Sequence, residues 1–70
     1  MYLEKILAEK GISKNAIAMK ARIQPSDFYQ AINGKRPFFP AWRRRIANTL
    51  GMPEEAVFPE FHQGKGEAEK

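Results

Sequence analysis

The chain of 70 residues contains no cysteine and a single histidine, His62. The lack of cysteine excludes a disulfide framework and a cysteine-based zinc site. A lone histidine leaves a histidine-based metal or catalytic centre without partners. No glycine-rich phosphate loop is present either. We therefore expect a protein that is not an enzyme and that holds no metal or cofactor.

Long apolar runs are also missing. No stretch approaches the roughly 20 apolar residues that a membrane span needs, and the first eleven residues mix charged and apolar side chains instead of forming a signal-peptide core. Hydrophobic residues nevertheless make up 43% of the chain, which favours a folded domain over disorder. We expect one small cytoplasmic domain with no membrane segment.

The net charge of +4 is unevenly distributed. Residues 13–45 hold eight Lys and Arg against Asp27 alone, a net charge of +7. Residues 1–12 are neutral, and residues 46–70 carry a net charge of −3. A polyanion is the obvious partner of such a basic segment. Charge alone leaves a second interpretation equally open, a solvated basic surface that keeps a small protein in solution.

Apolar periodicity predicts an all-α domain of five short helices and no strand. The predicted helices span residues 2–10, about 14–21, 25–33, 40–50 and 53–57. Ser13 is suited to cap the second helix and Pro25 to begin the third. Gly11, Asn33-Gly34 and Gly51 follow the last apolar positions of the first, third and fourth helices, where a residue with positive φ commonly ends a helix.

The last part of the chain differs in composition. Residues 62–70 are rich in Gly, Glu and Lys and contain one apolar residue, Ala68. We predict a folded domain over residues 1–61 and a disordered tail over 62–70. Phe58 and Phe61, just before this boundary, are expected to pack on the core or across a dimer interface, because two exposed Phe side chains would form an unusual patch.

These residues resemble the Cro/C1-type helix-turn-helix family, also called XRE-like or lambda-repressor-like. The resemblance covers residues 3–58. It rests on a leucine-containing first helix, Gly11-Ile12-Ser13, Ala18, Ile23 and Phe28, followed by Asn33-Gly34-Lys35-Arg36, Ile46-Ala47 and Leu50-Gly51. The implied fold is a five-helix domain with a central helix-turn-helix, in which Ala18 allows a close helix crossing while Ile23 and Phe28 fill the angle between the two helices.

The chain departs from the family pattern at two places. Arg22 occupies the turn position that is usually glycine, so either the arginine accepts a left-handed backbone at a cost of about 1 kcal/mol or the turn differs. Leu7 and Ile32 occupy positions where many members carry a buried arginine and glutamate. Replacing a buried ion pair by packed apolar groups is often neutral or stabilising, so we predict that Leu7 and Ile32 are buried in mutual contact.

The resemblance also implies a DNA-binding surface. The outward residues of the third helix's N-terminal half would contact bases in the major groove. These are Gln24, Ser26, Tyr29 and Gln30. Of these four, Gln30 is the best candidate, since a glutamine amide can pair with both N6 and N7 of adenine. The residues expected to hold the sugar-phosphate backbone are Lys14, Asn33, Lys35, Arg36 and Arg43. Each of these positions could instead be an ordinary polar surface residue.

Together these features predict a sequence-specific transcriptional regulator, a repressor of prokaryotic, phage or other mobile-element origin whose partner is double-stranded DNA. A module this small rarely makes enough contacts alone, so we expect a homodimer at least on DNA. The alternative is a protein-interaction module of the same fold, such as an antitoxin-like partner. A polar recognition face flanked by positive charge favours DNA over that alternative.

Overall fold

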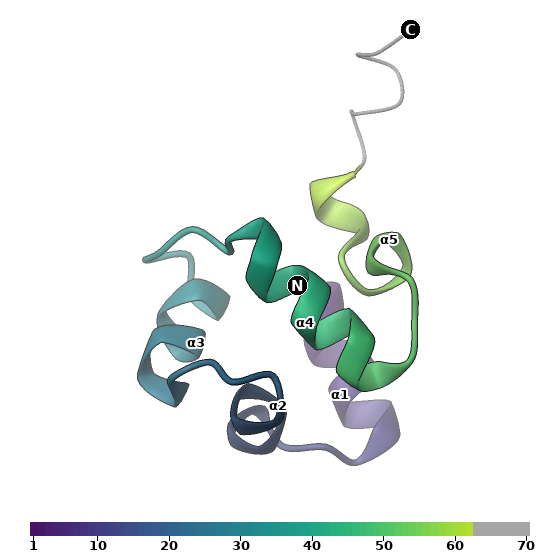
Figure 1. The fold of residues 1–70 in the computed structure, drawn as a ribbon, viewed down its shortest axis with the longest axis horizontal. Coiled ribbons are helices and arrows are strands. Elements are labelled where there is room, and N and C mark those ends of the chain that lie inside the picture. Colours follow the sequence, from purple (N-terminus) through teal and green to yellow (C-terminus); the bar gives the residue numbers. More distant parts are fainter. Residues whose placement is uncertain (63–70) are drawn as a thin grey trace, which may run out of the picture.

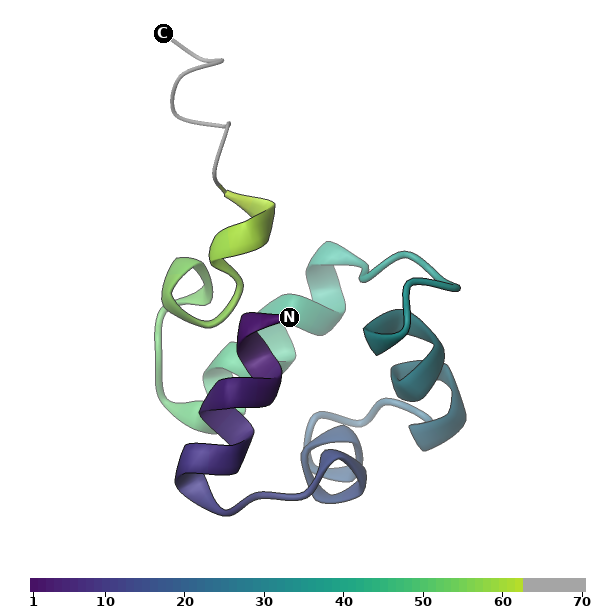
Figure 2. The ribbon, with the colours of Figure 1, turned by 180° about the vertical axis from the view of Figure 1, so that it is seen from behind.

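The computed structural model describes residues 1–62, and this part of the chain is all α-helical. The helices are α1 (Tyr2–Lys10), α2 (Lys14–Lys20), α3 (Pro25–Ile32), α4 (Pro40–Leu50) and α5 (Glu54–Val57), followed by a 3₁₀ turn, η1 (Pro59–Phe61). The five predicted helices are confirmed with ends that agree within one residue, whereas η1 was not predicted. In Figure 1, α4 lies in front of α1, with α3 on one side and α5 on the other, and Figure 2 shows the same arrangement from behind.

Four helices end in the same backbone motif. In each case a residue with positive φ follows the helix, and the next amide donates a hydrogen bond to the carbonyl five residues earlier, as Ile12 does to Leu7 at 2.9 Å. The residues with positive φ are Gly11, Arg22, Gly34 and Gly51. Three of the four helices thus use glycine at this position, and α2 uses arginine.

The expected helix starts are also confirmed. The Ser13 hydroxyl accepts a hydrogen bond from the amide of Ala16 at 3.0 Å, which satisfies one of the free N–H groups at the beginning of α2. Pro25 occupies the first turn of α3 and Pro40 that of α4, where the missing N–H has no helical partner.

The core is formed by one apolar face from each helix. Leu3, Ile6 and Leu7 of α1 are buried, as i, i+3, i+4 spacing predicts. The largest fully buried side chains are Phe28, Phe58, Leu3, Ile17, Ile46 and Val57. Trp42 and Leu50 of α4 are partly buried against this cluster.

Phe38, in the segment between α3 and α4, packs against both Phe28 of α3 and Phe58 of the C-terminal segment. Its side chain is buried, and its ring centroid lies 5.9 Å from that of Phe28 and 5.1 Å from that of Phe58. The sequence pattern placed this residue in a loop and gave it no core role. Because Phe38 is anchored in the core, its contacts fix the path of the chain after α3. They thereby help to position Asn33, Lys35 and Arg36, which lie between α3 and Phe38.

The C-terminal segment packs on the domain less completely than expected. Phe58 is fully buried, as predicted, but Phe61 is 38% exposed, and its ring packs against Phe38, Phe58 and the guanidinium of Arg43. The Glu60 carboxylate accepts a hydrogen bond from the backbone amide of Tyr2, so η1 is also joined to α1.

The structure describes the first residue of the predicted tail, His62. His62 is partly buried, and its Nε2 lies 3.2 Å from the Oε2 of Glu54. The remainder of the predicted tail, residues 63–70, lies outside the described residues. None of the helices in residues 1–62 has the length and apolar character required to cross a bilayer.

Candidate nucleic-acid interface

The α2–turn–α3 unit packs on the rest of the domain through buried apolar side chains. Helix α2 packs against α3 and against α4. Ala18 is fully buried, and Ile23 and Phe28 are buried as well, so all three serve the core and none is available to a ligand. Because these residues hold the inner side of the unit, the polar residues between them are directed outward.

Arg22 accepts the left-handed backbone, which settles the choice left open by the sequence. Its φ is +62°, and it is the one residue other than glycine with positive φ in residues 1–62. The amide of Ile23 donates to the carbonyl of Ala18 at 2.8 Å, so the turn has the same hydrogen bonds as the three glycine-ended helices. The turn geometry is therefore preserved, and the strain is borne by the arginine.

The four residues predicted to contact bases are exposed together at the start and along the outer side of α3. Gln24, Ser26 and Gln30 are all solvent-exposed, and Tyr29 is 41% exposed. The Tyr29 ring makes an edge-on contact with the ring of the buried Phe28, with 6.2 Å between the two centroids. The Tyr29 hydroxyl forms no hydrogen bond within residues 1–62, so it can bond to a ligand. All four predicted base contacts are therefore exposed to solvent, three of them on α3 and Gln24 at the residue before it.

Arg36 is folded back onto α3. Its Nε donates to Oε1 of Gln30 at 3.3 Å, and its Nη2 lies 3.6 Å from Oδ1 of Asp27. Asp27 therefore holds the arginine beside the candidate base-contacting glutamine. The Gln30 amide nitrogen stays free to donate, and its oxygen retains a second lone pair for a further hydrogen bond.

Lys14 lies at the first turn of α2 and is partly neutralised. Its Nζ is 3.4 Å from Oε2 of Glu4, whose other oxygen accepts from the N-terminal ammonium of Met1 at 2.7 Å. The ammonium hydrogen bond, with a smaller contribution from Lys14, holds the pKa of Glu4 below its usual value. Glu4 therefore stays ionised at neutral pH and keeps Lys14 beside α1.

Asn33 and Lys35 are exposed directly after α3. Lys35 has no ion-pair partner among residues 1–62, so its charge is available to an outside anion. These two residues and Arg36 surround Gly34, whose φ of +80° turns the chain away from α3. The three predicted backbone contacts that follow α3 are therefore close in the chain and exposed.

Arg43 is not placed with the other predicted contacts. Its Nε lies 3.1 Å from Oε2 of Glu54, and its guanidinium carbon lies 4.4 Å from the centre of the Phe61 ring. The pair is an ionic contact without hydrogen-bond alignment, because the buried Nε has no hydrogen-bond partner. The Arg43 side chain is 15% exposed and is used to hold the C-terminal segment. The sequence carried a signal for this, since Arg43 lies three and four residues before the buried Ile46 and Ala47.

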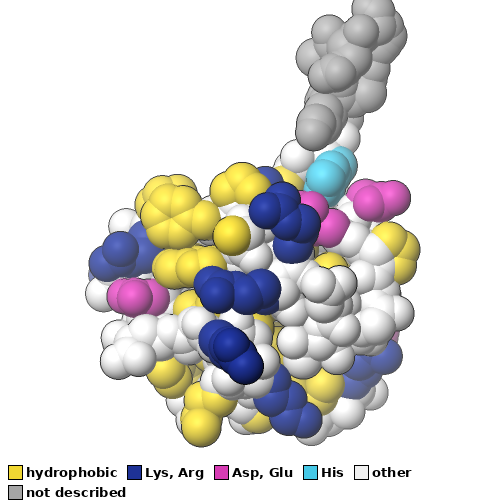
Figure 3. All heavy atoms as spheres, viewed as in Figure 1, with side chains coloured by type: hydrophobic (Ala, Val, Ile, Leu, Met, Phe, Trp, Pro, Cys, Tyr) yellow, Lys and Arg dark blue, Asp and Glu magenta, His cyan; other side chains and the backbone are white. Residues whose placement is uncertain are grey.

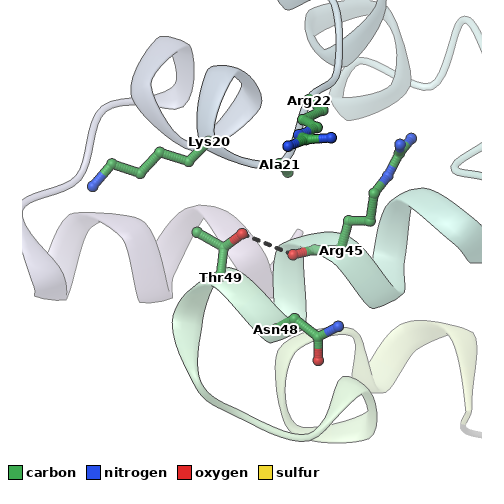
Figure 4. A pocket seen from close by; sticks show the side chains of 6 residues that line it. All are labelled: Lys20, Ala21, Arg22, Arg45, Asn48 and Thr49. Carbon is green, nitrogen blue, oxygen red and sulfur yellow. Dashed lines mark hydrogen bonds between the residues drawn. The ribbon is translucent and has the colours of Figure 1, made fainter.

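Sequence reasoning also missed a basic groove between the end of α2 and α4. Its lining residues are Lys20, Ala21, Arg22, Arg45, Asn48 and Thr49. Figure 4 shows Arg22 and Arg45 extending from facing elements, while Lys20 extends to the other side. In Figure 3 a row of Lys and Arg side chains crosses this face of the molecule, over α4 and α2. The departure from glycine at Arg22 was the one sequence signal for this groove.

Comparisons with known proteins assign the chain to no family. No protein-family model, curated protein or solved structure matches it. The resemblance to the Cro/C1-type family therefore rests on the residues and spacings of this sequence.

Proposed function

We propose that this chain is a sequence-specific DNA-binding regulator with a lambda-repressor-like helix-turn-helix, and that α3 enters the major groove. The observation that carries the proposal is the outer surface of α3. There, Gln24, Ser26, Tyr29 and Gln30 are exposed on a helix whose inner face is held by the buried Phe28 and Ala31. Polar side chains fixed in this way can present donors and acceptors to base edges.

Positive charge around α3 supports the proposal. Lys35 and Arg36 follow the helix directly, and residues 13–45 as a whole carry a net charge of +7. Cations beside a recognition helix supply sequence-independent attraction to phosphates and set the orientation of the protein on the duplex. Base contacts from α3 and phosphate contacts from the residues that follow it are thus assigned to separate groups of side chains.

The small size of the domain supports binding to DNA as a dimer. Specific protein–DNA interfaces bury on the order of 1,000 Å² or more of protein surface, and single small modules bury less. We propose that two copies occupy two half-sites in the cytoplasm of a prokaryotic cell, and that the bound dimer represses transcription by blocking the polymerase. Half-sites about one helical turn apart are the expected pattern in the operator.

Selection of binding sites from a random duplex library tests this proposal. The expected result is a partly palindromic motif, recovered at moderate salt and bound far more tightly than unrelated duplexes. A parallel mobility shift on random DNA at low and high salt should show binding that weakens steeply as salt rises. A chain that binds no duplex at low salt would overturn the proposal.

A protein-interaction module of the same fold is the second candidate. Exposed apolar side chains favour it to some degree: Phe39 is 41% exposed and Met19 is 63% exposed. A partner protein that docks on these side chains would leave DNA binding absent, or unchanged when α3 is substituted. The same mobility shift, repeated with Gln30→Ala, therefore separates the two candidates.

A further inference from the structure

We infer that Arg22 and Arg45 form a second DNA contact, a phosphate-binding clamp in the groove between the end of α2 and α4. This inference rests on the proposed DNA-binding function and adds a contact outside the surface of α3. The groove is an open surface pocket of about 260 Å³, which leaves room for a phosphate group between the two side chains.

The first support is the backbone of Arg22. The left-handed conformation is unfavourable for a residue with a β-carbon, and the ends of α1, α3 and α4 avoid that strain by using Gly11, Gly34 and Gly51. The hydrogen bonds at the end of α2 are the same as at the other three ends, so the turn itself does not require arginine. Observed backbone strain of this kind is concentrated at functional positions.

The second support is electrostatic. Arg22 and Arg45 line one groove from facing elements, and their like charges repel each other across it. Among residues 1–62, no carboxylate lies within ion-pair distance of either guanidinium. By contrast, Arg36 and Arg43 each have a carboxylate partner. An anion placed between Arg22 and Arg45 would relieve the repulsion.

The chemistry of the groove favours a phosphodiester. Guanidinium groups pair with phosphate oxygens through two parallel hydrogen bonds. Asn48 also lines the groove and has an amide that can donate, whereas the Thr49 hydroxyl is already donating to the carbonyl of Arg45 at 2.9 Å. Arg22 precedes the first candidate base contact, Gln24, by only two residues, so a duplex held by α3 brings its backbone near this turn.

The experiment compares two double variants of equal charge. Arg22→Gly with Arg45→Gln removes both cations of the clamp, and glycine keeps the left-handed turn. Lys5→Gln with Lys10→Gln removes two exposed cations of α1 that lie outside the groove. Each protein is titrated against one fixed duplex at several salt concentrations, and circular dichroism checks that all of them are folded.

The clamp variant should bind more weakly than the parent. Its slope of log affinity against log salt should become shallower by about 1, because the two side chains of the clamp hold one phosphate between them. The α1 variant should keep the parent's slope. Equal slopes for the clamp variant and the parent would overturn the clamp while leaving the proposed function intact. A parent protein that binds no duplex would overturn both.

Discussion

The Nε of Arg43 lies 3.1 Å from Oε2 of Glu54, and the same guanidinium packs over the ring of Phe61 at 4.4 Å. One side chain of α4 thus holds both α5 and η1. His62 meets the same carboxylate oxygen at 3.2 Å, so Glu54 joins α4 to the last described residue. This cluster lies at the C-terminal segment, and its interactions are structural.

Replacing Arg43 should therefore affect stability more than DNA binding. Arg43→Ala removes a partly exposed ion pair and a cation–π contact, and we expect a loss of about 1–2 kcal/mol in the free energy of unfolding, measured in urea. Arg44→Ala is the matched control, since Arg44 is exposed and should change stability by less than about 0.5 kcal/mol. A lower DNA salt slope for Arg43→Ala with unchanged stability would restore Arg43 as a phosphate contact.

Gln30 should contribute sequence preference. Gln30→Ala removes both the donor and the acceptor of the amide, so affinity for the best site should fall by about 1–3 kcal/mol and preference should relax at one base pair. Lys35→Ala is the comparison: it should weaken binding to all sequences alike and lower the salt slope by about 1. Competition titrations against duplexes that differ at single positions measure both effects. Identical sequence preferences for Gln30→Ala and the parent would mean that α3 does not contact bases through this residue.

Arg22 offers a separate test of backbone strain. Arg22→Gly relieves the left-handed conformation but loosens the unfolded chain, and the balance should stabilise the domain by up to about 1 kcal/mol. Arg22→Ala keeps the strain, so the two variants should differ by about 1 kcal/mol, or about 4–8 °C in melting temperature for a domain of this size. Equal melting temperatures would show that the strain at this turn is no larger than the entropy that glycine adds to the unfolded chain.

The sequence predicted most of the fold because local signals agree with the tertiary structure. The apolar spacing of α1 and α4, the Ser13 cap and the glycines with positive φ each act within a few residues of the chain. Phe38 and η1 were missed for the opposite reason. The role of Phe38 depends on Phe28 and Phe58, which are distant in sequence, and η1 is fixed by Glu60 contacting Tyr2.

The candidate site was predictable to a similar extent. Exposure of Gln24, Ser26, Tyr29 and Gln30 follows from the helix period once Phe28 is placed in the core. The directions in which the side chains of Arg43, Arg44 and Arg45 point could not be predicted in the same way. Successive positions on a helix point to different sides, but which of them meets Glu54 or faces Arg22 depends on how α4 packs against its neighbours.

Leu7 and Ile32 occupy the positions at which many members of the Cro/C1-type family, which this sequence resembles, carry a buried ion pair. Direct contact between the two side chains remains a prediction. Leu7 is buried, and Ile32 is partly buried against the core. In a double-mutant cycle of Leu7→Ala and Ile32→Ala, contact should appear as a coupling energy of at least about 0.5 kcal/mol. Leu7→Ala combined with Met19→Ala, whose side chain is exposed, should instead be additive. Additive effects in both cycles would show that Leu7 and Ile32 are not in contact, and would weaken the alignment of this sequence with the Cro/C1-type family.

Two shortened chains test how the C-terminal segment closes the core. A chain that ends at His62 should unfold within about 0.5 kcal/mol of the full chain, because residues 63–70 contain one apolar residue and so have little surface to bury. A chain that ends at Val57 loses the fully buried Phe58 and the Phe61 ring against Arg43. Deleting a buried Phe side chain alone costs about 3–5 kcal/mol, which is a large share of the stability of a small domain.

Thermal and urea unfolding of the two shortened chains and the full chain give the comparison. We expect the chain that ends at Val57 to melt far below the other two, with native-like helix content lost at moderate temperature. Similar stability of both shortened chains would show that Phe58 does not close the core. A marked loss on ending the chain at His62 would show instead that residues 63–70 contribute to the folded domain, contrary to the boundary that the composition predicts.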